Sequence, residues 1–461
     1  MAYVLGIDSS TQSTKALLVE ADTGQVVEQR RAPHPEGTEV DPRAWLAAVD
    51  EAAGPLLRRA SAVAVGGQQH AMVALDEHGD LVRDALLWND TRSAPQAAEL
   101  VAEMGGPEAC VDELGYVLVA SITSTKLRWM AEHEPENAAR TASVLLPHDF
   151  VSHHLGDGST APVTDRGDAS GTGYYSTKAE AWSRAHLVQA LGHEAGLPEV
   201  APAPNSVVGL TALGAPIAAG TGDNAAAALG LSLGPGEVSV SIGTSGVAAM
   251  VSGQRPADSS GTVTGFADAS GRFLPMGTTI NASGILDLGC RLLGVGYDEL
   301  SRLALASRPG AGGVALLPYF GGERTPNRPD ATGVFSGITY DTTRQDVARA
   351  VIEGLLCSVA DVVAAVEQVA ATQAARILFI GGGAQSEAVR ALAPTVFGRP
   401  ITVPPAAEYV ALGAARQAAW ALEGGSQPPA WELAGATHID AEHHPEVLER
   451  YLELKNSTAA W

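Results

Sequence analysis

One pattern of strands and turns occurs twice in this sequence, and no other feature constrains the fold as strongly. Near the N-terminus, β-type runs at residues 3–7, 15–20 and 25–31 are separated by turn-forming residues and predict an antiparallel meander. Apolar residues at helical spacing then predict a helix over residues 42–59, and a further strand is predicted over residues 62–65. Three strands, a helix and a fourth strand are therefore expected to open the chain.

The same kind of opening occurs again in the second half of the chain. A strand is predicted over residues 237–242, a turn of small residues over 243–246 and another strand over 247–251. Further along, a buried-type strand over residues 376–380 is followed by three glycines and a helix over residues 386–397. We interpret the two openings as a duplicated unit. The later order of strand, glycine turn and helix suits nucleotide binding.

The length of the chain favours more than one domain. A chain of 461 residues is too long for one hydrophobic core, so two or three domains with a cleft between them are expected. The run Gly234-Pro235-Gly236 breaks regular structure just before the second meander, and we place the boundary there. The prediction is an α/β protein with an N-terminal domain over residues 1–236 and a C-terminal domain over residues 237–461.

Composition excludes several classes of function. Hydrophobic residues form 46% of the chain and charged residues 18%, which is ordinary for a globular protein. The formal net charge of -23 repels nucleic acid and anionic membrane surfaces, so neither is expected as a partner. A metal–nucleotide complex is compatible with this charge, because Mg²⁺ and backbone amides bind phosphate locally.

The few cysteines and the apolar segments bear on the cellular compartment. The three cysteines, Cys110, Cys290 and Cys357, lie far apart in the sequence and fit neither a disulfide framework nor a zinc site. The first residues have no basic region before an apolar stretch, and no apolar run has membrane-spanning length. The expected location is the reducing cytoplasm.

The turn after the first strand contains groups that bind phosphate and metal. Asp8 ends this strand, and residues 9–15 supply hydroxyls, backbone amides and the Lys15 ammonium. Converging N–H donors suit phosphate oxygens, and a carboxylate at a strand end can hold Mg²⁺ through its waters. A polar hairpin loop that binds nothing has the same composition, so both interpretations stay open at this point.

Two glycine-rich turns in the second half offer further nucleotide contacts. Residues 243–246 would supply amides and a hydroxyl to phosphate, although a simple hairpin turn looks the same. Residues 381–385 let the backbone approach a flat ligand closely, which favours contact with adenosine. Ser386 and Glu387 suit the start of the next helix, and a plain strand-to-helix turn is the alternative.

Asp223 lies between Gly220-Thr221-Gly222 and an alanine-rich helix. The structural interpretation is an N-cap, which is a common role for Asp at such a place. The functional interpretation is a general base that accepts the proton of an attacking alcohol, with the helix dipole favouring the ionised carboxylate. The two roles are compatible with each other.

Polar side chains follow two further strand-like segments of the first half. Gln69 and His70 come after the strand at residues 62–65, and Asn89 and Asp90 come after a later turn. Amide, imidazole and carboxylate groups are suited to binding a hydroxyl-rich substrate. Taken singly, a histidine is more often a structural residue and an Asn-Asp pair more often a turn.

Together these segments resemble the FGGY family of carbohydrate kinases, and in particular its xylulose-phosphorylating members. The resemblance extends in order over most of the chain, through ten short segments. These are Gly6-Ile7-Asp8, Gln69-His70, Leu87-Trp88-Asn89-Asp90, Leu146-Pro147-His148-Asp149, Gly222-Asp223-Asn224, Ser241-Ile242-Gly243-Thr244-Ser245-Gly246, Gly322-Glu323-Arg324-Thr325-Pro326, Gly333-Val334-Phe335-Ser336-Gly337, Gly381-Gly382-Gly383 and Ala411-Leu412-Gly413-Ala414-Ala415.

The resemblance implies two ribonuclease-H-like, actin-like ATPase domains that close on ATP and a sugar, and it implies a role for each matching residue. Asp223 would be the catalytic base and Asp8 a catalytic residue that holds Mg²⁺ through water. The sugar-binding residues would be Gln69, His70, Asn89, Asp90 and Asn224. The residues that hold ATP would be Thr11, Lys15, Gly243 and Thr244 at the phosphates and Gly382, Gly383 and Gln385 near the adenosine.

The reaction implied by the resemblance is phosphorylation of D-xylulose at its C5 hydroxyl, and a homodimer is expected by family analogy alone. The alternatives are a kinase for ribulose, gluconate or glycerol, and a non-enzymatic actin-like ATPase switch. Two positions depart from the family pattern. Ser10 replaces a usual glycine in the first turn, and Ala71 replaces a glycine after His70, which is expected to make the sugar pocket tighter by one methyl group.

Overall fold

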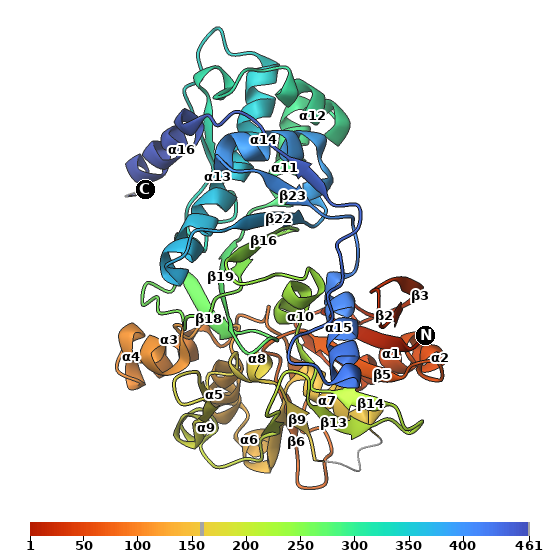
Figure 1. The fold of residues 1–461 in the computed structure, drawn as a ribbon. Helices are drawn as coiled ribbons and strands as arrows, with labels where there is room; N and C mark the ends of the chain where they lie inside the picture. Colours follow the sequence, from red (N-terminus) through yellow and green to blue (C-terminus); the bar gives the residue numbers. More distant parts are fainter. Residues whose placement is uncertain (157–160, 460–461) are drawn as a thin grey trace. The chain divides into compact units, whose positions relative to one another are not determined.

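The computed structural model describes residues 1–156 and 161–459, and these residues form two compact units (Figure 1). Unit 1 comprises residues 1–233, 252–274 and 407–432, and unit 2 comprises residues 234–251, 275–406 and 433–461. Within the described part of the chain, no helix combines the length and the apolar character needed to cross a membrane.

The sheet of unit 1 contains the predicted meander. Strand β1 pairs antiparallel with β2, β2 pairs antiparallel with β3, and β1 pairs parallel with β5, which places Asp8 beside Gly66. A short strand, β15, also pairs with the end of β5. The strand order is β13 (Val207–Leu210), β14 (Pro216–Ala218), β5 (Ala62–Gly67), β1 (Tyr3–Ser9), β2 (Ser13–Glu20) and β3 (Val26–Pro33), with β15 (Thr221–Gly222) off this path.

Alternation along β1 buries both faces of this sheet. Leu5 and Ile7 pack with the apolar face of α1 (Arg43–Ala52), while Val4 faces the other way and packs with alanines of α15 (Tyr409–Glu423). The helix predicted over residues 42–59 is in fact two helices, because α1 ends at Ala52 and α2 covers Gly54–Leu57. Gly54 and Pro55 explain the break, since proline is accepted at the first turn of a helix but not in its interior.

The rest of unit 1 consists of short helices and two-stranded sheets. Segment 252–274 contributes β18 (Val263–Ala267), which packs against α8. The remaining helices are α3 (Ala94–Glu103), α4 (Pro107–Leu114), α5 (Thr123–His133), α6 (Pro135–Arg140), α7 (Pro147–Leu155), α8 (Arg166–Ala169), α9 (Arg184–Leu191) and α10 (Asp223–Gly230). The small strand pairs are β4 (Glu39–Val40) with β7 (Ala85–Leu86), β6 (Val73–Leu75) with β8 (Ser143–Leu145), β9 (Val163–Thr164) with β12 (Glu199–Val200), and β10 (Tyr175–Ser176) with β11 (Ala181–Trp182).

The sheet of unit 2 repeats the pairing of unit 1, as the duplicated sequence pattern predicted. Strand β16 pairs antiparallel with β17 and parallel with β22, in the same way that β1 pairs with β2 and β5. From β19 onward the order is β19 (Phe273–Thr279), β17 (Gly246–Met250), β16 (Glu237–Ile242), β22 (Arg376–Ile380), β23 (Ile401–Val403) and β24 (Thr437–Ile439). The predicted bounds of β16 and β22 agree with the structure.

The helices of unit 2 are centred on the long helix α13, which packs against α11, α12 and α14. Thr343 and Asp346 form a capping box at its start. The helices are α11 (Ser283–Leu293), α12 (Tyr297–Leu305), α13 (Arg344–Ala370), α14 (Glu387–Phe397) and α16 (Pro445–Ser457), and β20 (Ala315–Leu317) pairs with β21 (Val334–Ser336).

The units are more interleaved in sequence than a single boundary describes. The chain leaves unit 1 after Leu233, close to the predicted break at residues 234–236. Residues 252–274 and 407–432 are nevertheless part of unit 1, although they fall within the predicted C-terminal domain of residues 237–461.

Candidate active site

Asp8 lies near the end of β1 and is almost completely buried, with 1% of its surface exposed. Its carboxylate accepts a hydrogen bond from the Ser10 hydroxyl, and the Lys15 ammonium lies 3.5 Å away. Burial raises the pKa of Asp8, and the positive charge of Lys15 partly offsets this. Residues 9–12 form the turn without a positive φ, so Ser10 is accommodated where the family pattern has glycine.

Lys15 lies between two carboxylates in this structure. Its ammonium donates to Glu408 at 2.7 Å and is also paired with Asp8. Glu408 precedes α15, so this contact joins the first hairpin to a segment almost 400 residues later in the chain. A contact of Lys15 with phosphate stays a prediction.

Asp223 is the first residue of α10, and the residue before it has the N-cap position. Gly222 of β15 is extended because it pairs with Gly67 of β5, and the helix begins at Asp223, one residue earlier than an Asp223 N-cap requires. The Asp223 carboxylate instead accepts hydrogen bonds from the backbone N–H and the side-chain amide of Asn224, at 2.8 and 2.9 Å. The N-cap interpretation of Asp223 is therefore wrong, while the place at a helix N-terminus is as predicted.

The environment of Asp223 disfavours its charge. Burial raises the pKa of Asp223 to about 7, and the negative charges of Asp8 and Asp168 add to this effect. A carboxyl with a pKa near neutrality is well matched to general-base chemistry. The structure thus gives Asp223 a property that the sequence alone did not predict.

Gln69 and Asn224 lie beside Asp223. The Asn224 side-chain amide donates to Gln69 Oε1 at 3.0 Å as well as to Asp223. Gln69 also lies against Gly222, where an added Cβ would approach its amide nitrogen to 2.7 Å. Three of the predicted site residues, Gln69, Asp223 and Asn224, are therefore brought into one cluster by the pairing of β15 with β5.

His70 follows Gln69 and has an uncommon backbone conformation. Its φ is 69°, which is rare for a residue with a Cβ, and the residue is buried, at 7% exposure. The ring lies 5.2 Å from that of Phe266, which belongs to β18. Ala71 is completely buried and belongs to the apolar core that also contains Val65 and Val73, and its effect on the sugar pocket stays a prediction.

Asn89 and Asp90 have different surroundings. Asn89 is exposed, while Asp90 is 5% exposed and accepts hydrogen bonds from Thr38 at 2.7 Å and from the Arg92 guanidinium at 2.9 Å. These contacts give Asp90 a structural role as an anchor for the loop. Its predicted contact with sugar stays a prediction. Beside it, Trp88 donates from Nε1 to the Thr11 hydroxyl at 2.9 Å and so joins this loop to the first turn.

Unit 2 contains a cavity of about 820 Å³ that is lined by all five residues predicted to hold nucleotide in this unit. They come from the β16–β17 turn and from the segment after β22, including the short 3₁₀ helix Gly383–Gln385. The volume is within the range of nucleotide-sized sites. The predicted residues are Gly243, Thr244, Gly382, Gly383 and Gln385, and the wall is completed by residues that include Leu286, Tyr297, Asp298, Ser301 and Arg390.

The three glycines after β22 have different functions in the packing. An added Cβ at Gly383 would overlap the side chain of Ile242, and one at Gly381, where φ is 88°, would lie 2.7 Å from the Ile242 carbonyl oxygen. At Gly382 a Cβ would meet nothing within 4 Å. Gly381 and Gly383 therefore let the turn pack on the end of β16, and Gly382 faces open space at the cavity.

The donor set of unit 1 fits a hard divalent cation. Asp8 and Asp223 both carry carboxylate oxygens, which Mg²⁺ prefers, and each lies in an environment that disfavours an uncompensated negative charge. A cation near Asp8 would relieve the repulsion between the two groups. The residues present are therefore compatible with the predicted water-mediated metal contact of Asp8.

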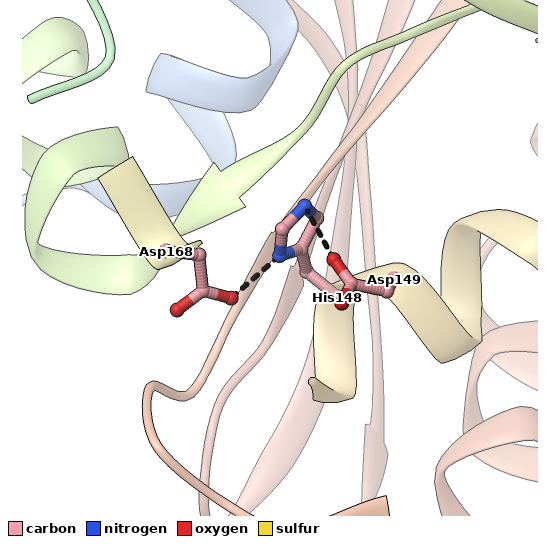
Figure 2. Close-up of side chains that lie close together, drawn as sticks. All are labelled: His148, Asp149 and Asp168. Atoms are coloured by element: carbon pink, nitrogen blue, oxygen red, sulfur yellow. Dashed lines mark hydrogen bonds and ion pairs between the residues drawn. The ribbon is translucent and has the colours of Figure 1, made fainter. Parts of the chain in front are cut away.

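Several residues of this region were not predicted from the sequence. Glu408 and Phe266 lie in residues 407–432 and 252–274. No local feature of the sequence indicates that these segments belong to unit 1. A buried cluster of His148, Asp149 and Asp168 also lies in unit 1 (Figure 2). Its first two members stand in the Leu146-Pro147-His148-Asp149 segment of the family resemblance, which was the available signal.

Comparisons with known proteins show the family of this chain. Residues 3–230 match the N-terminal domain of the FGGY family of carbohydrate kinases, and residues 238–422 match its C-terminal domain. Xylulose kinases of Streptomyces coelicolor and Streptomyces rubiginosus are each 44% identical, over 96% and 99% of this chain and 94% and 96% of theirs. The crystal structure of xylulose kinase from Bifidobacterium adolescentis has a TM-score of 0.93 and 44% identity, over 98% of this chain and 99% of that one. This chain belongs to the FGGY family of carbohydrate kinases.

Proposed function

We propose that this protein transfers the γ-phosphoryl group of ATP to the C5 hydroxyl of D-xylulose, giving D-xylulose 5-phosphate and ADP. The relatives named above are xylulose kinases and align over nearly the whole chain. The observation that carries the chemistry is Asp223, a carboxyl with a pKa of about 7 that lies beside the polar side chains of Gln69 and Asn224.

Asp223 is the proposed general base. As the C5 oxygen forms its bond to the γ-phosphorus, the hydroxyl proton passes to the Asp223 carboxylate and the bond from phosphorus to the ADP oxygen breaks. Asn224 donates two hydrogen bonds to Asp223 Oδ1, one from its backbone and one from its side chain, and so orients the carboxylate. The proton leaves Asp223 after the product departs, which a pKa near 7 permits at neutral pH.

The proposed sugar ligands are Gln69, His70, Asn89, Asp90 and Asn224. Gln69 and Asn224 already share a hydrogen bond, so a sugar hydroxyl that enters this cluster meets amide groups whose positions are fixed. His70 offers a ring nitrogen from a backbone position that few side chains adopt. The strain at His70 is consistent with a functional role, because strained residues cluster at active sites.

The proposed nucleotide ligands are Thr11 and Lys15 in unit 1 and the five cavity residues in unit 2. The amides and hydroxyl of residues 243–246 suit phosphate oxygens, and the open side of Gly382 admits a flat base. Mg²⁺, held through water by Asp8, would supply positive charge to the phosphates when bound. Lys15 would supply a second positive charge near the first turn.

A panel assay tests this function. The purified protein with MgATP and each of D-xylulose, D-ribulose, D-gluconate and glycerol is followed by coupled ADP release. We expect kcat/KM to be highest for D-xylulose, and a higher value for another substrate would assign the protein to a different branch of the family. Slow ATP turnover that is indifferent to every sugar would instead support an actin-like ATPase switch.

Asp223→Asn tests the catalytic role. A positioned general base contributes about 10²- to 10⁴-fold in rate, so kcat is expected to fall by that factor while ATP still binds. Turnover close to that of the natural protein would remove Asp223 from this role.

The assembly and the location can each be tested directly. By family analogy we propose a homodimer, which light scattering coupled to size exclusion measures directly. We also propose a cytoplasmic location, which the three scattered cysteines support. Fractionation of the native host cells tests it.

A further inference from the structure

His148 is completely buried between two carboxylates (Figure 2). Its Nδ1 lies 2.6 Å from Asp168 Oδ2, and its Nε2 lies 3.2 Å from Asp149 Oδ1. The other oxygen of Asp149 accepts from the Leu146 backbone N–H at 2.9 Å and fixes the start of α7. Because each ring nitrogen faces a carboxylate in a closed space, an imidazolium fits this cluster better than a metal ion does.

The cluster is connected to Asp223 by hydrogen bonds and by the chain. Asp165 is the N-cap of α8, and its carboxylate accepts from the backbone N–H groups of Gly167 and Asp168. The same carboxylate accepts from the Thr221 hydroxyl at 2.8 Å. Thr221 is the first residue of β15, two residues before Asp223, so the position of α8 determines where β15 and its successor lie.

The His148 side chain also supports the strands beside Asp223. An added Cβ at Gly67 would lie 2.8 Å from His148 Cβ, and one at Gly220 would lie 2.7 Å from its ring carbon Cδ2. Gly67 is the last residue of β5 and pairs with Gly222 of β15. His148 therefore packs against both backbone segments that carry the Gln69–Asp223–Asn224 cluster.

The charges in this region balance one another. Asp149 and Asp165 are buried, and burial raises their pKa values to about 7 and about 6. Burial alone would lower the pKa of His148, but the charges of Asp149 and Asp168 raise it to about 10. At neutral pH the imidazolium thus compensates carboxylates that have no access to solvent. Loss of His148 would leave the carboxylates beside it without a buried positive charge.

We propose that the His148–Asp168 ion pair, acting through Asp165 and Thr221, is a positioning unit that holds β15 and so fixes Asp223 for proton transfer. The proposal rests on the proposed role of Asp223. Neither His148 nor Asp168 needs to touch sugar or nucleotide for it to hold. The effect is on the orientation of the base and on the charge that surrounds it.

The first test is Asp168→Asn, which keeps the shape of the side chain. A small misplacement of a catalytic group can lower the rate by about 10²-fold, so kcat is expected to fall by about 10- to 100-fold. The KM values for D-xylulose and ATP are expected to change by less than about two-fold, because binding groups are unaltered. His154→Asn is the control: His154 lies on α7, the helix of His148, and pairs with Asp50 at 3.0 Å, but it is partly exposed.

The pH profile of kcat separates this role from a loss of folding. The charges that act on Asp223 are those of Asp8 and Asp168, and Asp168 is in turn grouped with His148, Asp149 and Asp165. Asp168→Asn removes one negative charge near Asp223 and leaves His148 paired with Asp149, so the acidic limb of the profile is expected to move to lower pH. An unmoved limb with natural kcat in a folded variant overturns the proposal.

Thr221→Val provides a second test that alters no charge. It removes the hydroxyl that donates a hydrogen bond to Asp165, so kcat is expected to fall several-fold. Thr221→Ser keeps this hydroxyl and is expected to have the kcat of the natural protein. Natural kcat in Thr221→Val would contradict the proposal, as would one tightly held metal ion per chain that is lost in Asp168→Asn. If the natural protein fails to phosphorylate D-xylulose, or Asp223→Asn stays active, the proposed function fails instead.

Discussion

The substitution Asp223→Asn has an expected consequence for stability that is opposite to its consequence for activity. Burial and the charges of Asp8 and Asp168 raise the pKa of Asp223 from the ordinary value of 3.8 to about 7. In the unfolded chain Asp223 ionises near 3.8. Between these two values, the unfolded state releases a proton that the folded state keeps.

The sign and size follow from this difference. Because ionisation favours the unfolded state, the free energy of unfolding falls by about 1.4 kcal/mol for each pH unit between 3.8 and 7 and is constant above that. The full loss above pH 7 is about 4 kcal/mol as an upper value. Asparagine has a similar shape and no charge, so Asp223→Asn is expected to recover up to this amount at pH 8.5 and about 2 kcal/mol less at pH 5.5.

Thermal unfolding in buffer free of nucleotide and divalent cations measures this effect. The melting temperature of Asp223→Asn is expected to exceed that of the natural protein by several degrees at pH 8.5, with a smaller difference at pH 5.5. Asp22→Asn, at an exposed position in a turn of the same unit, is the control and is expected to change neither value. An equal or lower melting temperature for Asp223→Asn at pH 8.5 would refute the reasoning.

Three further substitutions test other parts of the site. Gly383→Ala forces a methyl group against Ile242 and is expected to destabilise unit 2 by about 1–3 kcal/mol, as measured by denaturant unfolding, with a higher KM for ATP. Gly382→Ala is expected to leave unit 2 as stable as in the natural protein, because its methyl group meets nothing within 4 Å. Equal losses of unfolding free energy in the two variants would contradict this difference between the glycines. Lys15→Met removes a positive charge from the first turn and is expected to raise the KM for ATP at least several-fold, and an unchanged KM would exclude a phosphate contact by Lys15. Glu408 then loses its partner, so the stability of Lys15→Met is measured in parallel.

The sequence predicted the elements whose signals are local. The strand Glu237–Ile242 alternates polar and apolar residues between two glycines, and the strand Arg376–Ile380 is a short, mostly apolar run that ends at a glycine. The predicted limits of both agree with the structure. The break of the first helix at Gly54 and Pro55 also has a local signal, and the helical spacing of apolar residues outweighed it in our prediction. Apolar spacing indicates which face is buried, whereas proline decides where a helix can continue.

The site was predictable in composition but not in its detailed contacts. The N-cap interpretation of Asp223 followed a preference of single residues, while the pairing of Gly222 with Gly67 decided where the helix begins. The contact of Lys15 with Glu408 has no local signal, because the two residues meet only through the packing of α15. The raised pKa of Asp223 likewise depends on its burial and on the charges of Asp8 and Asp168, which come from two other elements.

Small residues explain how unit 1 holds its two important carboxylates. Helix α15 contacts both β1, which ends near Asp8, and α10, which begins with Asp223 (Figure 1). An added Cβ at Gly6 of β1 would overlap the backbone of Ala411, and added Cβ atoms at Gly230 and Gly413 would overlap the facing backbone between α10 and α15. The backbones are therefore in direct contact, with no side chains between them that could change rotamer.

This arrangement explains why the segment Ala411-Leu412-Gly413-Ala414-Ala415 belongs to a kinase pattern although none of its residues carries a reactive group. Backbone contact fixes the helix that bears Asp223 against the strand that bears Asp8 more rigidly than long side chains would. Alanines of α15 also pack in one core with Val4 and Leu17, which lie on the sheet face opposite to α1. A catalytic base needs a fixed position, and here the glycines and alanines of three distant segments provide it.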